Sequence, residues 1–286
     1  MVDDQYLGQA GQCVVCGRAI QLPAAISRGP AKAGKPNDMR VVRWVIAGTI
    51  AVAFVATLGV LAARYGGQGV RTLQTNRLRG QCLVNLQKVA TALNAYARDY
   101  GSYPPPTTFA EDGKTPQVSW RVLVLPYLGY QSLYDEYRLE EPWNSQHNQM
   151  LVEKMPREYR SPASAGSLPG EASYFLITGN GTLFPDSGPL GPGKVVDDPT
   201  KTILLVETAF SPLNTLQWTE PGDFALGAIS MNVNSGMGIG GSHAGGVTVA
   251  TVSGSSYWLR ESADSAVLRA LITPAGGEAL SDDVLE

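Results

Sequence analysis

Histidine and cysteine are scarce in this sequence, whose 286 residues include two histidines and three cysteines. Histidine is the usual general base in nucleophilic catalysis, so a site of that kind would have to include His147 or His243. Ser242 is next to His243 in the sequence but matches no nucleophile elbow. The surrounding segment, GMGIGGSHAGG, lacks the Gly-Lys-Ser/Thr ending of a phosphate-binding loop. We therefore expect no enzymatic activity and no catalytic residue.

Charged residues are missing from positions 44 to 63, between Arg43 and Arg64. A helix of twenty residues is about 30 Å long, which is enough to cross the hydrocarbon core of a bilayer. A buried core helix or a cleaved signal peptide are the alternatives. However, the polar leader of 43 residues is longer than an ordinary secretory signal. Core helices of soluble proteins are also rarely apolar on every side. The sequence therefore predicts one transmembrane helix over residues 44–63.

The orientation of this helix does not follow from the positive-inside rule, because basic residues flank both ends. Cys13 and Cys16 give a second indication, since a reduced thiol pair suits the cytosol. We therefore expect a cytoplasmic N-terminus, with the residues beyond 64 on the outside.

Acidic residues are missing from residues 64–98, which carry six bases, whereas residues 99–286 carry ten bases and 22 acids. An acidic outer domain argues against a nucleic-acid partner. The basic segment either contacts anionic lipid headgroups or presents a solvated face.

Cys13 and Cys16 form half of a zinc-ribbon motif, because tetrahedral zinc needs four ligands and the leader has no other cysteine and no histidine. A dimer could supply the second pair, or the motif could be a degenerate ribbon that binds nothing. We expect no cofactor, with zinc at Cys13 and Cys16 as the alternative. Cys82 is expected to be a buried thiol rather than part of an intermolecular disulfide.

The pattern of apolar residues divides the chain into a cytosolic segment (1–20), a flexible basic linker (21–43), the membrane helix (44–63), an amphipathic helix (64–101) and an extracytoplasmic head (102–286). Within the head, residues 173–178, 201–207 and 246–259 read as strands, and 262–271 as a last helix. Ser253-Gly254 indicates a two-residue hairpin turn. The predicted fold class is α+β, with the amphipathic helix on an antiparallel sheet and a β-rich C-terminal half.

Two further features of the head are expected to be structural. His243 should hydrogen-bond loop carbonyls and fix the entry to the hairpin, while Gly245 and Gly246 permit close backbone approach. Five acidic residues lack the spacing of an EF-hand calcium loop and read as surface acids. These are Asp197, Asp198, Glu207, Glu220 and Asp223.

A series of motifs along the chain resembles one bacterial family, the domain of unknown function 1559. The motifs are NLQKVATALNAYARDYGSYPP after Cys82, SWRVLVLPYL (119–128), PWNSQHNQ (142–149), MPREYRSP (155–162), KTILLVE (201–207), WTEPGD (218–223) and SHAGGVTVATVSGSSYWL (242–259). The resemblance runs from about residue 40 to about residue 278.

The resemblance implies a head like that of type IV pilins and the pseudopilins of type II secretion. It also implies a structural role for ten signature residues: Trp120, Pro126, Pro142, Trp143, His147, Glu207, His243, Gly245, Gly246 and Gly254. Three departures stand out. Ser253 replaces aspartate in the family's histidine, nine residues, Asp-Gly signature. Ser161 replaces a frequent cysteine, which leaves Cys82 unpaired. Residues 44–63 lack the glutamate of pilin precursors, which argues for an uncleaved anchor.

We therefore expect a pseudopilin-like protein, anchored by one helix in the bacterial inner membrane, whose head serves protein interaction or envelope structure. The expected partners are the membrane and either other envelope proteins or further copies of the chain. The alternative is a ligand-binding or sensory module whose responding element is the cytosolic Cys13–Cys16 segment.

Overall fold

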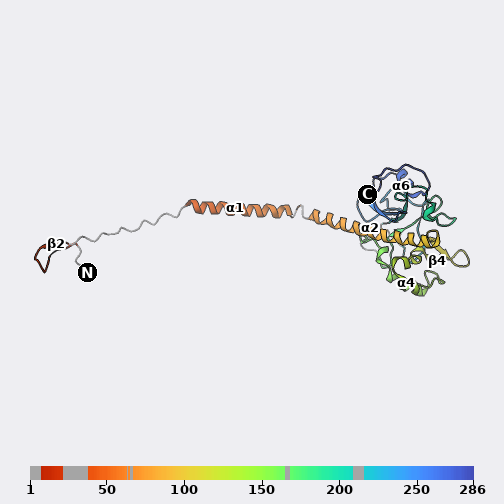
Figure 1. Cartoon of the computed structure of the whole chain (residues 1–286), viewed down its shortest axis with the longest axis horizontal. Helices are drawn as coiled ribbons and strands as arrows, with labels where there is room; N and C mark the ends of the chain where they lie inside the picture. Colours follow the sequence, from red (N-terminus) through yellow and green to blue (C-terminus); the bar gives the residue numbers. More distant parts are fainter. Residues whose placement is uncertain (1–7, 22–37, 63, 65–66, 165–167, 209–215) are drawn as a thin grey trace. The chain divides into compact units, whose positions relative to one another are not determined.

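The computed structural model describes residues 8–21, 38–62, 64, 67–164, 168–208 and 216–286. The chain divides into two compact units, Met1–Gly67 and Gln68–Glu286. From here on, the head means the second unit, which contains the amphipathic helix as well as the predicted head of residues 102–286. Figure 1 shows the elements in chain order.

The helices are α1 (Asp38–Leu61), α2 (Gly67–Tyr100), α3 (Trp120–Leu123), α4 (Gln131–Glu136), α5 (Gln146–Gln149) and α6 (Ser265–Ile272), with short 3-10 helices η3 (Pro126–Leu128), η4 (Val152–Lys154), η5 (Arg157–Tyr159) and η6 (Pro192–Lys194). The strands are β1 (Ala10–Gln12), β2 (Ala19–Gln21), β3 (Thr107–Phe109), β4 (Pro116–Ser119), β5 (Tyr174–Phe175), β6 (Ile177–Thr178), β7 (Ile203–Glu207), β8 (Phe224–Ala225), β9 (Gly246–Thr251) and β10 (Ser256–Arg260).

The first unit contains α1, which is long and apolar enough to cross a membrane. Its apolar stretch, Met39–Leu61, spans 23 residues, and none of its most apolar window is buried within the protein. Trp44, Ile50 and Phe54 are all well exposed. Such a helix is about 35 Å long. Apolar side chains on all sides of an exposed helix are unfavourable in water, so α1 has the length and composition of a membrane-spanning helix.

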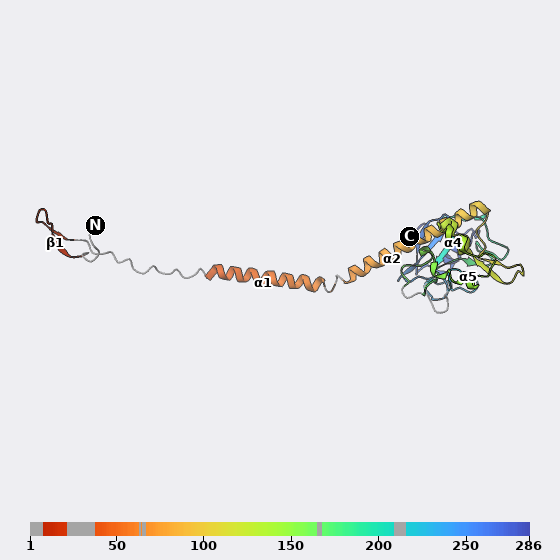
Figure 2. The same cartoon turned by 90° about the horizontal axis from the view of Figure 1, so that it is seen from below.

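In the head, α2 is amphipathic over its second half. Leu86, Val89, Ala90, Leu93 and Ala97 repeat at three- and four-residue steps, and all are buried. Together with side chains of β7 and β9 they form one hydrophobic core. The first turns of α2 project from the rest of the head (Figure 2), and residues 69–77 are exposed. The helix ends where Gly101 adopts a φ of 81°, which confirms the predicted end.

The main sheet is antiparallel with strand order β10-β9-β7-β5. Its central strands β7 and β9 are buried along their entire length, which explains why their sequences are nearly continuously apolar. Two-stranded pairings join β3 to β4, antiparallel, and β6 to β8, parallel. The predicted mixture of helices and antiparallel sheet is therefore confirmed.

The β9–β10 hairpin differs from the predicted two-residue turn. Strand β9 ends at Thr251 and β10 begins at Ser256, and the turn is closed by the Gly254 amide, which donates to the Thr251 carbonyl at 2.9 Å. The physical reason lies outside the hairpin. The Val252 and Ser253 amides donate to the carbonyls of Thr202 and Pro199, each at 2.9 Å, so these residues leave the ladder. Gly254, with a φ of 84°, supplies the left-handed position of the longer turn.

A buried ion pair connects α3 to the sheet. The Arg121 guanidinium lies 3.3 Å from the Asp223 carboxylate, and both side chains are almost entirely buried. Arg121 also donates to the Tyr174 carbonyl at 2.9 Å. Asp223 accepts the Leu176 amide at 2.8 Å and the Trp120 indole at 3.2 Å. Burial raises the pKa of Asp223 to about 6, although Arg121 and these donors oppose the shift.

We predict that Asp223→Ala lowers the free energy of unfolding by about 3–5 kcal/mol, because it leaves the Arg121 charge buried without a partner. Urea denaturation of the full-length protein in detergent, followed by tryptophan fluorescence, measures this change. The double variant Arg121→Met, Asp223→Ala should lose less than the sum of the two single variants. As a control, Asp186→Ala at an exposed site should change stability by less than about 0.5 kcal/mol. A loss below about 1 kcal/mol for Asp223→Ala would contradict the prediction.

Candidate functional site

Four polar side chains from distant parts of the chain meet inside the head. Cys82 comes from α2, Ser161 follows η5, Glu207 ends β7, and His243 lies in the loop before β9. The Cys82 Sγ is 3.1 Å from the Ser161 Oγ and 3.3 Å from the His243 Nε2. The Ser161 hydroxyl donates to the Glu207 Oε1 at 2.6 Å. We call these four residues the core polar cluster, and all four are buried.

Glu207 is the centre of the core polar cluster. Thr248 of β9 donates its hydroxyl to the Glu207 Oε2, so that each carboxylate oxygen accepts one hydroxyl. The loop that carries His243 passes over the same carboxylate. A Cβ at Gly241 would lie 3.2 Å from the Glu207 Oε2, and the Gly240 amide donates to the Glu207 carbonyl at 3.1 Å. A side chain at position 241 would therefore press on the carboxylate, which would have to shift by a few tenths of an ångström.

Burial controls protonation in the core polar cluster. It raises the pKa of Glu207, while the hydroxyls of Ser161 and Thr248 oppose the shift. Burial, followed by the nearby Glu207 charge, raises the pKa of the Cys82 thiol to about 11. A thiol with so high a pKa stays protonated near neutral pH and is a poor nucleophile. The arrangement of cysteine, histidine and glutamate is therefore unlike that of a cysteine hydrolase.

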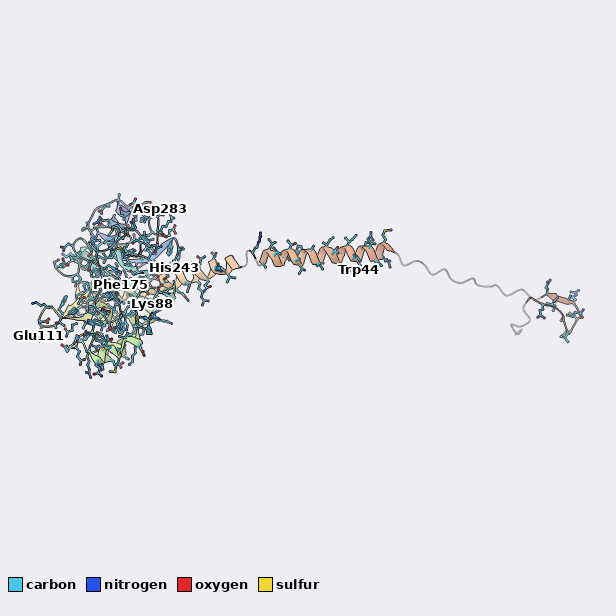
Figure 3. The ribbon with its side chains drawn as sticks, turned by 180° about the vertical axis from the view of Figure 1, so that it is seen from behind. Trp44, Lys88, Glu111, Phe175, His243 and Asp283 are labelled. Carbon is cyan, nitrogen blue, oxygen red and sulfur yellow. The ribbon has the colours of Figure 1, made fainter. Side chains whose placement is uncertain are left out.

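An aromatic side chain packs against His243 of the core polar cluster, and a cationic side chain packs against that aromatic ring. The His243 ring meets the Trp258 ring edge to face at 5.8 Å, and the Arg79 guanidinium lies 4.4 Å over Trp258. His243 lies beside the α2 ribbon in Figure 3. The Tyr174 hydroxyl is also buried, and its pKa is raised by burial and by its neighbours Glu207 and Cys82.

The donor atoms of the core polar cluster are of the kinds that bind metals. One ligand atom each from Cys82, Glu207 and His243 can be chosen so that all three lie within 4.8 Å of one another. Thiolate, imidazole and carboxylate are all common zinc ligands.

The predicted hydrogen bond between the His243 ring and a loop carbonyl was wrong. Its ring nitrogen faces the Cys82 thiol rather than a loop carbonyl, although the residue does precede the β9–β10 hairpin. Cys82 is a buried thiol, as predicted. Sequence reasoning did not bring Cys82, Ser161, Glu207 and His243 together. One signal was present, since Glu207 is a lone carboxylate at the end of an otherwise apolar strand.

Five other signature residues are buried in the core, begin a helix, make local hydrogen bonds or line a surface hollow. Trp120 is buried in the core, and Pro126 begins η3. The His147 ring nitrogen lies 2.8 Å from the Glu136 carbonyl. The Pro142 carbonyl accepts the Asn148 side chain at 3.1 Å, and Trp143 lines a surface hollow of about 480 Å³.

Two glycines of the signature are required by their surroundings. A Cβ at Gly246 would lie 2.4 Å from the Leu259 carbonyl oxygen, and Gly245 has a φ of 87°.

The prediction that the five acids without calcium spacing lie on the surface was wrong for Glu207 and Asp223. Both are buried, because Asp223 pairs with Arg121 and Glu207 belongs to the core polar cluster. Asp197 accepts the amides of Gly276 and Gly277, and Asp198 accepts the Thr200 amide. The Glu220 carboxylate accepts the Gln217 amide at 3.4 Å.

Cys13 and Cys16 lie in the turn between β1 and β2. The Gly17 amide donates to the Cys13 carbonyl at 2.8 Å, and Gly17 has a φ of 71°. The backbone amides of Val15 and Cys16 lower the pKa of the Cys13 thiol. Amides directed at a cysteine sulfur favour the thiolate, which is the form that binds metals.

A surface groove of about 860 Å³ lies between α2 and residues 153–162 and 169–170. It is lined by Arg77, Gly80, Gln81, Val84, Asn85, Lys88, Glu153, Met155, Arg157, Arg160, Pro162, Pro169 and Gly170. Four of these residues are basic and one is acidic. The groove is therefore lined by apolar and basic side chains, of which Lys88 and Arg157 pair with Glu158.

We predict that Ser161→Cys forms a disulfide with Cys82, because the two side-chain atoms are 3.1 Å apart. The bond would close a loop of 79 residues, which the loop-entropy relation equates with about 4.5 kcal/mol. Losing the hydroxyl donor to Glu207 costs about 1–3 kcal/mol. A net gain of about 1.5–3.5 kcal/mol should remain.

Thiol counting and urea denaturation of the Ser161→Cys variant, with and without reductant, measure the bond and its effect. Cys13→Ser and Cys16→Ser should be present so that only the engineered pair is counted. If the unfolded, unreduced protein still exposes two free thiols, the prediction fails.

Residues 79–202 match the protein family described as protein of unknown function, DUF1559. The match is shorter than the resemblance suggested, because α1 and the segment with Glu207, His243 and Gly254 lie outside it. No curated protein and no solved structure matches the chain. The matched segment includes Cys82, Ser161 and five of the ten signature residues, and over this segment the chain is similar to the DUF1559 family.

Proposed function

We propose that this protein is a single-pass, membrane-anchored member of its family, with a pilin-like head outside the cytoplasmic membrane that binds another envelope protein. The observation that carries the anchor is α1, whose 23-residue stretch Met39–Leu61 is apolar enough to cross a membrane and has none of its most apolar window buried. The absence of a glutamate in residues 44–63 favours a permanent anchor over assembly into a filament.

The groove on α2 supports the binding role. Val84 and Met155 offer apolar contact area, and Val84 is 51% exposed. Arg77 is exposed on the same helix face, and the Lys88 ammonium is held 3.0 Å from Glu158. A groove that is lined by basic and apolar side chains is complementary to an acidic segment with apolar side chains. The proposed partner is therefore an envelope protein that presents such a segment.

A second candidate function is metal sensing by the leader. It is favoured by the Cys13–Cys16 turn, where backbone amides stabilise the thiolate of Cys13. Two chains would bring four thiolates together and complete a tetrahedral zinc site. Zinc that is bound by the full-length protein and lost with Cys13→Ser and Cys16→Ser would support this function.

The orientation can be measured with the natural cysteines. Cys16 is exposed and Cys82 is buried, so a membrane-impermeant maleimide should label only the leader. We predict no labelling of the leader in intact spheroplasts and full labelling after permeabilisation. Glu111→Cys, at the exposed tip of the β3–β4 hairpin (Figure 3), should behave in the opposite way.

The control for this labelling is the double variant Cys13→Ser, Cys16→Ser, which should give no signal. Leader labelling in intact spheroplasts would overturn the orientation. Intact mass measurement of the same membranes should find an uncleaved N-terminus, and a mature start near residue 44 would overturn the permanent anchor.

The binding role predicts a charge-dependent crosslink. A photo-crosslinker at Val84 should capture an acidic segment of an envelope protein, whereas one at exposed Thr91, outside the groove, should not. Arg77→Glu with Gln81→Glu should reduce the Val84 crosslink by at least about tenfold, because like charges would then face each other. Arg98→Glu, which reverses an exposed charge on α2 outside the groove, is the matched control. An unchanged yield, or a captured segment without acidic residues, would contradict the proposal.

A further inference from the structure

We propose that Cys82, Glu207 and His243 bind a structural zinc ion in the core of the head. The ion would join three segments that are far apart in the sequence: α2, the end of β7 and the loop before β9. This inference is independent of the orientation of the chain and of the partner that the groove binds.

The distances in the cluster fit a tetrahedral ion. With zinc bonds of about 2.3 Å to sulfur and 2.0 Å to nitrogen, the two ligand atoms of a tetrahedral site are about 3.5 Å apart. The observed separation of the Cys82 Sγ and the His243 Nε2 is 3.3 Å. A carboxylate oxygen of Glu207 completes a set of three atoms that lie within 4.8 Å of one another. Little rearrangement is therefore needed to place an ion among them.

Oxygen atoms are available for the fourth position. The Ser161 hydroxyl is 3.1 Å from the Cys82 sulfur and 2.6 Å from the Glu207 carboxylate. The Tyr174 hydroxyl is a second candidate, because it is buried next to Cys82.

Charge balance favours a divalent cation. Glu207 is buried in the core. Among the described residues, its carboxylate accepts the hydroxyls of Ser161 and Thr248 and forms no ion pair with a lysine or an arginine. A thiolate, a carboxylate and a neutral imidazole together carry two negative charges, which one Zn²⁺ neutralises. On binding, the Cys82 thiol releases its proton to solvent, as does the Glu207 carboxyl when it is protonated. The loaded site is neutral, as a buried site should be.

The surroundings indicate a structural ion rather than a catalytic one. Catalytic zinc keeps one position open to substrate, whereas structural zinc is enclosed. Here Trp258 packs against His243, and Arg79 lies over Trp258. Zinc is favoured over harder ions such as Mg²⁺ because sulfur and nitrogen supply two of the three ligands.

The test uses full-length protein in detergent with Cys13→Ser and Cys16→Ser, so that the leader cannot contribute metal. After incubation with zinc and desalting, elemental analysis should find one zinc per chain. Cobalt in place of zinc should give a thiolate-to-cobalt charge-transfer band and the intense visible bands of four-coordinate cobalt. Zinc should also raise the melting temperature of this protein.

Two variants separate the site from general stability. Adding Ser161→Cys and oxidising the pair removes the Cys82 thiolate in a cross-linked fold, and its zinc content should fall close to zero. If that bond does not form, Cys82→Ser serves the same purpose. His243→Gln should also lose the ion, whereas His147→Gln, which changes the other histidine, should keep it.

The proposal is overturned if the full-length protein with Cys13→Ser and Cys16→Ser retains no zinc after desalting. It is also overturned if bound cobalt lacks the thiolate band. Neither result depends on a core substitution, so a variant that fails to fold cannot obscure it.

Discussion

The head is organised around a carboxylate that cannot reach water. Glu207 ends a strand that is buried along its whole length, and its oxygens are held by hydroxyls of Ser161 and Thr248. An unsatisfied buried carboxylate would cost several kcal/mol, so these partners have to be in place whenever the sheet is formed. The requirement fixes the position of the segment that carries Ser161, and that segment in turn lies against Cys82 on α2.

A second buried charge organises the other part of the head. Arg121 and Asp223 bring α3 to the segments around Tyr174 and Leu176. Removing one partner would leave the other charge buried without a counter-charge, whereas replacing both with apolar groups can leave the free energy of unfolding nearly unchanged. The two charged centres therefore contribute more to the specificity of the fold than to its net stability. The apolar surface of α2, β7 and β9 supplies the larger favourable term.

Local patterns predicted the local elements. The spacing of Leu86, Val89 and Leu93 was sufficient for α2, since one helix face repeats every three to four residues. The apolar runs at β7 and β9 were equally clear. The hairpin turn was not predicted correctly, because the Val252 amide bonds to Thr202, which is far away in the sequence. The partners of Cys82 lie 79 and 161 positions away along the chain. A local repeat of apolar residues cannot predict contacts between residues so far apart in the sequence.

Helix α2 connects the two proposed sites. Its inner face carries Cys82 to the core polar cluster, and its outer face carries Val84 and Lys88 to the groove. Residues this close on one helix move together, because helical hydrogen bonds keep the turn rigid. An ion bound by Cys82, Glu207 and His243 would fix the axial position and rotation of α2 on the sheet. The groove would then be presented in one shape, and a partner would bind without first ordering the helix, which reduces the entropic cost of association.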